Sequence, residues 1–162
     1  MDPTCSIVYE NEPMEKNTMS QKPRPFSSSF FDLKKLTTSI LQGIMITVGL
    51  LIIYQYAIQN GANEDTTRTM VFTGLVTANV LLTLVNRSFY YSIFTTMKYK
   101  NNLVVFIVGI TIFVTGLLLF VPPITSFFQF ERLTISQLAI SIGIGFVSVF
   151  WYELVKLYKR IT

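Results

Sequence analysis

Few side chains in this sequence can perform chemistry, and the clearest candidate is a carboxylate beside a proline. Asp2 precedes Pro3, and residues 4–9 are mildly apolar. If residues 1–9 are the second half of a membrane helix, Asp2 lies near mid-bilayer, where a carboxylate costs about 2.5–3.5 kcal/mol. Pro3 has no backbone N–H, so it leaves a carbonyl of the preceding turn free to face a cation, as in an unwound helix. The alternative is an exposed N-terminus in which these two residues have no such role.

A second candidate lies in residues 68–88, which are apolar enough to cross a bilayer. Their interior holds five polar side chains: Thr73, Thr77, Asn79, Thr83 and Asn86. At about 100° per residue these fall on one half of a helix, and the other half is entirely apolar. In a membrane this division predicts that the apolar half meets lipid and the polar half meets other helices or a watery path. Asn79 could then line an ion path with Thr77 and Thr83; the alternative is hydrogen bonding between helices, typically about 0.6 kcal/mol.

Other kinds of chemistry are excluded by composition. The sequence has no His and one Cys, which excludes His/Cys metal sites, Cys-His or Ser-His catalysis and an intrachain disulfide. It has no phosphate-binding Gly-rich loop, nucleophile elbow or paired-carboxylate site. We therefore predict no catalytic residue and no cofactor in this chain.

The elements that position these candidates are membrane helices. The chain has 162 residues, of which 51% are hydrophobic and only 14% charged, against about 25% charged in a soluble domain. Apolar runs predict full spans at about 36–58, 68–86, 103–121 and 135–157. Residues 1–12 are interpreted as the end of a truncated transmembrane helix, and 13–35 as a cytoplasmic loop. The expected fold is all-α: an integral membrane bundle of four full helices plus a partial N-terminal helix.

The positive charges predict how these spans are oriented. Of the 13 Lys and Arg, all but Arg68 and Arg132 fall in residues 13–35, 87–102 or the C-terminal end. The positive-inside rule places those segments, and both termini of the four-span unit, on the cytoplasmic side. The net charge of +4 is then explained by topology. We expect no nucleic-acid partner, and we expect a multi-pass protein of the plasma membrane.

Several other residues are predicted to have structural roles. Gln42, Gln55 and Glu153 lie near span ends, and Glu153 is expected to pair with Lys156 on a helix surface. Small residues are spaced four apart in the last span, which allows a neighbouring helix to approach closely. These residues are the pairs Ala139/Gly143 and Ser141/Gly145, with Gly109 and Gly116 as further candidates in the third span.

The order of these motifs is similar to that of a known family. The run MDPTCSIVYE at residues 1–10, followed by Lys22-Pro23-Arg24-Pro25, resembles the end of the sixth membrane helix and the next loop of P-type cation-transporting ATPases. It is most similar to bacterial calcium-type pumps. Residues 41–43 are similar to the seventh helix of these proteins, and residues 68–73 and 86–88 to the ends of the eighth. The resemblance covers essentially the whole chain.

The resemblance implies a function for the candidate residues. The chain resembles the C-terminal transmembrane domain of an ATP-driven cation pump, from the end of helix six to helix ten. Asp2 matches the helix-six Asp that coordinates the transported cation, and Pro3 the point where that helix unwinds. Asn79 falls on helix eight, where a polar residue can assist as a weaker ligand. Animal calcium pumps tend to carry an acidic group there, so Asn79 leaves the identity of the cation open, with calcium as one candidate.

The resemblance also implies what the chain lacks. The phosphorylated-Asp motif, the nucleotide-binding domain and helices one to five are absent from the sequence. We therefore expect a truncated or split part of a longer pump, inactive alone, whose partners are lipid, the transported cation and the missing N-terminal part. The complete pump would use ATP and Mg. The alternative is an independent four-span structural or accessory membrane protein, which the intact charge pattern and the small-residue faces would also suit.

Overall fold

The computed structural model describes residues 10, 33–88, 93 and 101–161, and over these ranges the secondary structure is helical without strands. The helices are α2 (Leu33–Gln59), α3 (Glu64–Val85), α5 (Asn102–Phe120), α6 (Pro122–Phe127) and α7 (Ile135–Ile161). Within these ranges four helices, all but α6, are long and apolar enough to cross a membrane. The predicted all-α membrane bundle is confirmed. The partial helix expected at residues 1–12, with Asp2 and Pro3, lies almost wholly outside the described residues.

The helix ends follow from capping residues. Asn63 precedes α3, and its side-chain oxygen accepts a hydrogen bond from the backbone N–H of Thr66 at 2.8 Å. Glu64 and Asp65 occupy the first turn, where carboxylates favourably oppose the helix dipole. For this reason α3 begins four residues before the predicted span. The third span ends before Pro122 as predicted, but Pro122 then starts the short helix α6, because proline is well suited to a first helical turn.

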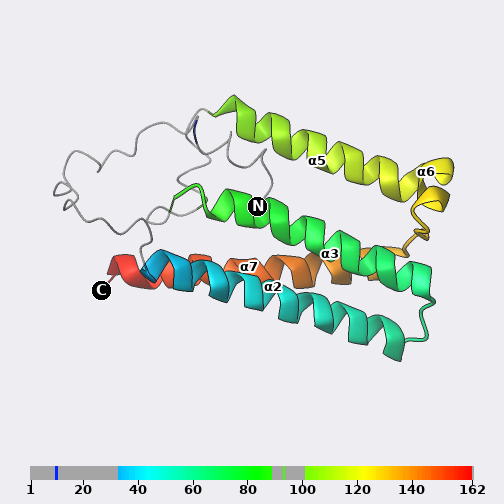
Figure 1. Ribbon diagram of the computed structural model, residues 1–162, viewed down its shortest axis with the longest axis horizontal. Helices are drawn as coiled ribbons and strands as arrows, with labels where there is room; N and C mark the ends of the chain where they lie inside the picture. Colours follow the sequence, from blue (N-terminus) through cyan, green and yellow to red (C-terminus); the bar gives the residue numbers. More distant parts are fainter. Residues whose placement is uncertain (1–9, 11–32, 89–92, 94–100, 162) are drawn as a thin grey trace.

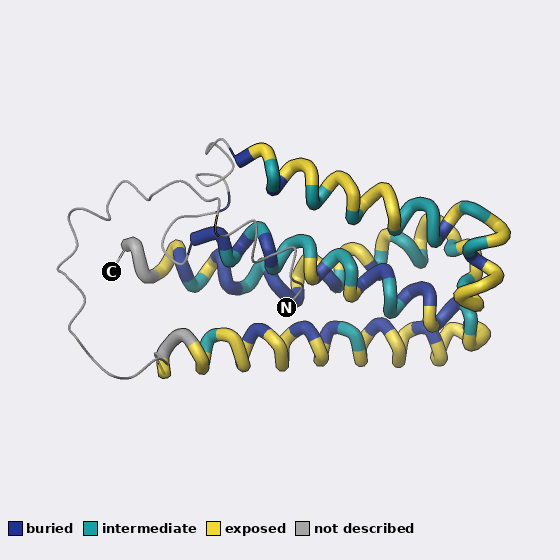
Figure 2. The backbone as a smooth tube through the Cα atoms, turned by 45° about the horizontal axis from the view of Figure 1, so that its top comes forward, coloured by how far each residue is buried: buried dark blue, intermediate teal, exposed yellow. Residues whose placement is uncertain are grey.

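Three of the four long helices form the core of the bundle. Helix α7 packs most extensively on α3 and also on α2, and α2 packs on α3. Helix α5 lies along the far side of α3, next to α6 (Figure 1). Only Val104 and Leu119 of α5 are buried, and most of this helix is drawn as exposed or intermediate in Figure 2. The position of α3 is therefore set chiefly by α2 and α7.

The prediction that the apolar half of α3 faces lipid is wrong, whereas Thr69, Thr73 and Thr83 of the polar half are buried, as expected of a half that meets other helices. Met70, Gly74 and Ala78, from the apolar half, are buried, and Met70 packs in one cluster with Ile53 and Ala57 of α2. The physical reason is that α3 is central, so its apolar half supplies the contacts with α2 and α7.

Thr69, Thr73, Thr77 and Thr83 of α3 each donate a hydrogen bond within the helix. Their hydroxyls donate to the carbonyl four residues earlier: Thr69 to Asp65 at 2.6 Å, Thr73 to Thr69 at 2.8 Å, Thr77 to Thr73 at 2.8 Å and Thr83 to Asn79 at 2.9 Å. A hydroxyl bonded in this way leaves a methyl group for packing. Thr69, Thr73 and Thr83 are accordingly buried despite their polarity.

The closest approach between α3 and α7 occurs at glycines. A Cβ atom added to Gly145 would lie 2.7 Å from the backbone oxygen of Gly74 and 3.1 Å from Cβ of Thr77. Ser141, one turn earlier on α7, is fully buried. The predicted Ser141/Gly145 pair therefore does lie at a close helix contact.

The other predicted small-residue positions do not lie at close contacts. A Cβ atom added to Gly143, Gly109 or Gly116 would meet nothing within 4 Å. Ala139 is exposed. Spacing alone could not distinguish the two pairs of α7, because both fit the same pattern and only one faces α3.

We predict that Gly145→Ala destabilises the complete protein by about 1–3 kcal/mol, because the backbone of α3 must move away from the new methyl group. Gly143→Ala is the matched control on the same helix, with open space at its Cβ. The melting temperature of the purified protein in detergent measures the difference. Equal melting temperatures for the two variants would contradict the close contact.

Candidate functional site

Asn79 is the predicted cation ligand that lies within the described residues. It lies on α3, and its side chain is exposed. Leu75, one helical turn earlier, is also exposed. This face of α3 is thus not covered by α2, α5 or α7. Lipid offers an amide no hydrogen-bond partner, so an uncovered Asn in a membrane-spanning segment is a candidate for contact with another polar group.

The structure places the two predicted companions of Asn79 differently. Thr83 lies one turn away, and its hydroxyl donates to the backbone carbonyl of Asn79. Thr77 is half-buried and lies near Gly145 of α7. Thr83 is therefore the threonine next to Asn79, whereas Thr77 belongs to the contact between α3 and α7.

A buried ion pair lies where α3 ends. Lys156 Nζ is 2.9 Å from Glu153 Oε1, and the two side chains are only 2% and 3% exposed. Lys156 also donates to the backbone carbonyl of Val85 at 2.5 Å, and the backbone N–H of Ile93 donates to Glu153 Oε2 at 3.2 Å. We call these four groups the Lys156 clip. The clip joins α7 to the last residue of α3 and to the segment that follows it.

Glu153 and Lys156 do form the predicted pair, but the prediction that this pair lies on the helix surface was wrong. Lys156 is four residues after buried Tyr152 and seven after buried Val149, so it continues the core face of α7. Its ammonium group also lies 5.4 Å from the centre of the Tyr152 ring. The spacing of Lys156 from Tyr152 and Val149 is the feature of the sequence that could have predicted its burial. A pairing rule based on sequence separation alone cannot tell a surface face from a core face.

A second polar contact ties α2 to the same end of α3. The side-chain amide of Gln42 donates to Asn86 Oδ1 at 3.1 Å, and the Asn86 amide donates back to Gln42 Oε1 at 3.4 Å. Gln42 is buried, and each amide satisfies the other. The structural role predicted for Gln42 agrees with this contact. Gln55, by contrast, is exposed on α2.

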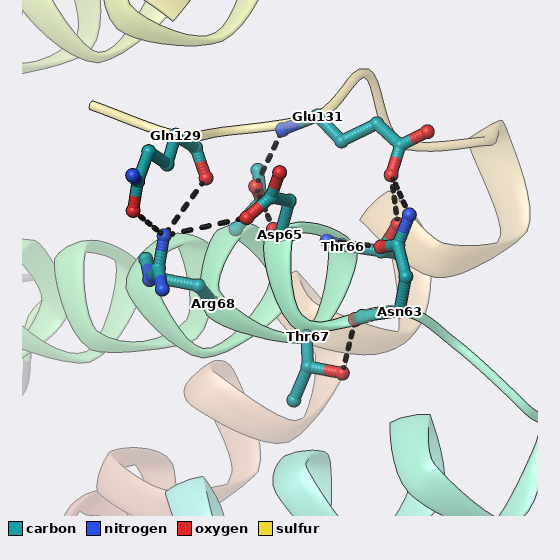
Figure 3. A network of polar contacts seen from close by, with 8 residues as sticks. Asn63, Asp65, Thr66, Thr67, Arg68, Gln129 and Glu131 are labelled. Atoms are coloured by element: carbon teal, nitrogen blue, oxygen red, sulfur yellow. Dashed lines mark hydrogen bonds and ion pairs between the residues drawn. The ribbon is translucent and has the colours of Figure 1, made fainter. Parts of the chain in front are cut away.

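The opposite end of α3 is held by the loop between α6 and α7 (Figure 3). Asn63 and Thr66 donate to Glu131 Oε2 at 2.6 Å and 2.7 Å, and the backbone N–H of Glu131 donates to Thr69 Oγ1 at 3.0 Å. We call Asn63, Thr66, Thr69 and Glu131 the Glu131 clasp. The hydrogen bond from Thr66, and then that from Asn63, lowers the pKa of Glu131 below its ordinary value of 4.5.

Arg68 holds the start of the same loop. Its Nη1 atom donates to the backbone oxygen of Gln129 at 3.2 Å and to the side-chain oxygen of Gln129 at 2.9 Å, and it lies 3.4 Å from Asp65 Oδ1 (Figure 3). Gln129 has φ of 53°, the left-handed conformation that usually favours glycine at a helix end. The two bonds from Arg68 help to stabilise this conformation, which turns the chain from α6 toward α7.

Within the described ranges, no group of three or more His, Cys, Asp or Glu side chains could hold a metal ion. Asn79 supplies a single neutral oxygen there. The clasp and the clip fix the two ends of α3, the helix that carries it. The described geometry is thus a helix with a firmly held position and one exposed amide.

Comparison with known proteins agrees with the sequence resemblance. Residues 1–158 match the family described as "Cation transporting ATPase, C-terminus". The chain belongs to this family. The match covers the positions of Asp2, Pro3 and Asn79, and it confirms that the chain corresponds to the C-terminal membrane region of a P-type cation ATPase.

Individual relatives are calcium-transporting ATPases by name. The chain is 26% identical over 127 residues to Calcium-transporting ATPase 1 of Yarrowia lipolytica, a match that covers 78% of this chain and 14% of that protein. It is 24% identical over 149 residues to Calcium-transporting ATPase type 2C member 1 of Homo sapiens, covering 92% of this chain and 16% of that protein. The chain therefore spans only about one seventh of the length of the curated relatives it matches.

We predict that the Glu131 clasp weakens in acid. Because the folded protein lowers the pKa of Glu131, its contribution to stability is present above pH 4.5 and is lost as the pH falls through the lower, folded-state pKa. Glu131→Gln should therefore lower the melting temperature at pH 7, and the gap to the wild-type protein should narrow below about pH 4.5. Glu64→Gln removes a carboxylate at the same end of α3 but outside the clasp; it loses only the interaction with the helix dipole, so its effect on the melting temperature should be smaller. A gap that is the same at both pH values would show that the carboxylate charge does not contribute.

Proposed function

We propose that this chain forms one wall of the cation path of an ATP-driven, calcium-type pump, and that it transports nothing without the rest of that pump. The observation that carries this proposal is the exposed Asn79 on α3 in a chain of the cation-ATPase family. The threonine hydroxyls of the same helix bond to its own carbonyls. Asn79 is thus the interior amide of α3 whose side chain points out of the bundle, toward the space that other helices of the pump would fill.

The chemistry of the two candidate ligands suits a hard cation. Calcium binds oxygen ligands, including carboxylates and the side-chain carbonyls of Asn and Gln. Asn79 would supply a neutral oxygen, and Asp2 a carboxylate from the partial helix that the sequence predicts over residues 1–12. Pro3 would free a backbone carbonyl beside Asp2. The names of the relatives favour calcium as the transported ion.

The rest of the pump would supply the energy and the remaining ligands. ATP and Mg would be bound by the phosphorylation and nucleotide-binding domains, which this sequence does not contain. The positive-inside rule would place Arg87 and residues 13–35 on the cytoplasmic side and Arg68 and the Glu131 clasp on the other side. The plasma membrane as the location of the pump is a further part of the proposal.

One observation favours the second candidate, an independent four-span structural protein. Helices α2, α3 and α7 pack around buried residues of their own, such as Ile53, Met70 and Val149. Expression of residues 1–162 alone distinguishes the two functions. A stable, defined oligomer that neither binds a cation nor associates with a separately expressed N-terminal pump fragment would favour the structural role.

The assignment of Asp2 is tested in the complete pump. Asp2→Asn should abolish cation-dependent phosphorylation by ATP, because the site loses its charged ligand. Asp32→Asn, in the predicted loop 13–35, is the control for loss of a carboxylate. Unchanged cation dependence of phosphorylation in Asp2→Asn would refute the assignment.

Asn79→Ala should have a weaker effect of the same kind. The half-saturating cation concentration for phosphorylation should rise by about tenfold or less, which corresponds to about 1.4 kcal/mol or less. Gln55→Ala is the matched control, because Gln55 is an exposed amide on another span, α2. If Asn79→Ala lowers only the yield of folded protein and leaves cation affinity unchanged, Asn79 has a packing role instead.

A further inference from the structure

The Lys156 clip is the most completely buried set of charges in the described part of the chain, and cation binding does not use it directly. Both side chains belong to α7, yet each also contacts the backbone of another segment: Lys156 the carbonyl of Val85, and Glu153 the N–H of Ile93. A charged pair within a membrane-spanning helix is costly to bury and calls for a functional explanation.

The contact at Val85 is suited to fixing how deeply α3 sits relative to α7. Val85 is the last residue of α3, and the last carbonyls of a helix have no partner within it. An ammonium group at this point is also favoured by the negative end of the helix dipole. Because the contact is to a backbone atom, its strength depends on where the end of α3 lies and hardly on the side chain at that position.

In the middle of the same interface the two helices pack closely at small residues: Gly145 of α7 lies against the backbone of Gly74 and the side chain of Thr77 on α3. Within the described residues, hydrogen bonds from α3 to other elements lie at its two ends. One end is held by the Glu131 clasp, whose Glu131 lies in an exposed loop, and the other by the buried Lys156 clip.

We propose that Glu153 and Lys156 are positioning residues, which set the depth of α3 in the membrane and thereby place Asn79 in the cation path. This inference rests on the proposed function. Asn79 is six residues before Val85, so the clip holds the helix about 9 Å along its axis from the candidate ligand. A straight helix transmits a displacement over such a length, so loosening the clip would move the Asn79 amide relative to ligands on other helices.

The decisive variant removes both charges together in the complete pump. In Glu153→Gln/Lys156→Met no buried charge is left unpaired, so the protein should still fold. The half-saturating cation concentration for phosphorylation should nevertheless rise by about threefold or more, because α3 loses the donor to Val85. The maximal level of phosphoenzyme, normalised to folded protein, should stay close to the wild-type level. Lys156→Arg in otherwise wild-type protein keeps a positive donor, so this single variant should retain most of the wild-type cation affinity.

Arg132→Met serves as the control, since it removes a positive charge from an exposed position. Wild-type cation affinity in the folded double variant would overturn the positioning role and leave the clip as a purely structural contact. If the double variant does not fold, Glu153→Gln alone still decides, because wild-type cation affinity in that variant would overturn the proposal. A wild-type pump without cation-dependent phosphorylation would instead contradict the proposed function itself.

Discussion

The contact of backbone with backbone at Gly74 and Gly145 is the constraint on which the rest of the bundle depends. No larger residue fits at Gly145 unless the backbone of α3 moves. Lipid tails are as apolar as leucine, so helices in a membrane gain little from the hydrophobic effect and associate through close packing and hydrogen bonds. The glycine contact provides the close packing. Met70 and Ala78 of α3 are buried in two hydrophobic clusters, Met70 with Ile53 and Ala78 with Val149.

Polar groups at the two ends of α3 add contacts whose geometry depends on where the helix lies along its axis. At one end, Glu131 binds the capping residue Asn63 and the hydroxyl of Thr66. At the other, Lys156 binds the last carbonyl of α3. The long apolar middle needs no such groups, because its threonines bond to their own helix. Polar interactions between elements therefore concentrate at the ends of α3, and packing dominates between them.

The sequence was sufficient for the parts of this structure that depend on local pattern. The four spans follow from apolar length, the end of α5 from Pro122, and the close approach of α7 from Ser141 and Gly145. The predictions that failed depend on which face of a helix is covered by its neighbours. The apolar half of α3 was expected to face lipid, but Met70, Gly74 and Ala78 are buried because α3 is the central helix. Glu153 and Lys156 were placed on a surface because a spacing of three residues does not reveal which face of α7 is covered. Of the candidate site, Asn79 could be identified as an interior amide, but its exposure required the arrangement of all four helices.

The exposure of Asn79 is informative because α3 is otherwise so thoroughly covered. Helices α2 and α7 bury most of its apolar half, and α5 lies along another side. The uncovered strip carries Leu75 and Asn79, an arrangement that lipid would satisfy poorly at the amide. Facing another helix of a pump, the same strip would combine apolar packing at Leu75 with one neutral oxygen at Asn79. A neutral ligand contributes less to the binding of a divalent cation than a carboxylate does, so its contribution depends strongly on its position. A helix held firmly at both ends meets that requirement, which links the buried ion pair of α7 to a ligand on a different helix.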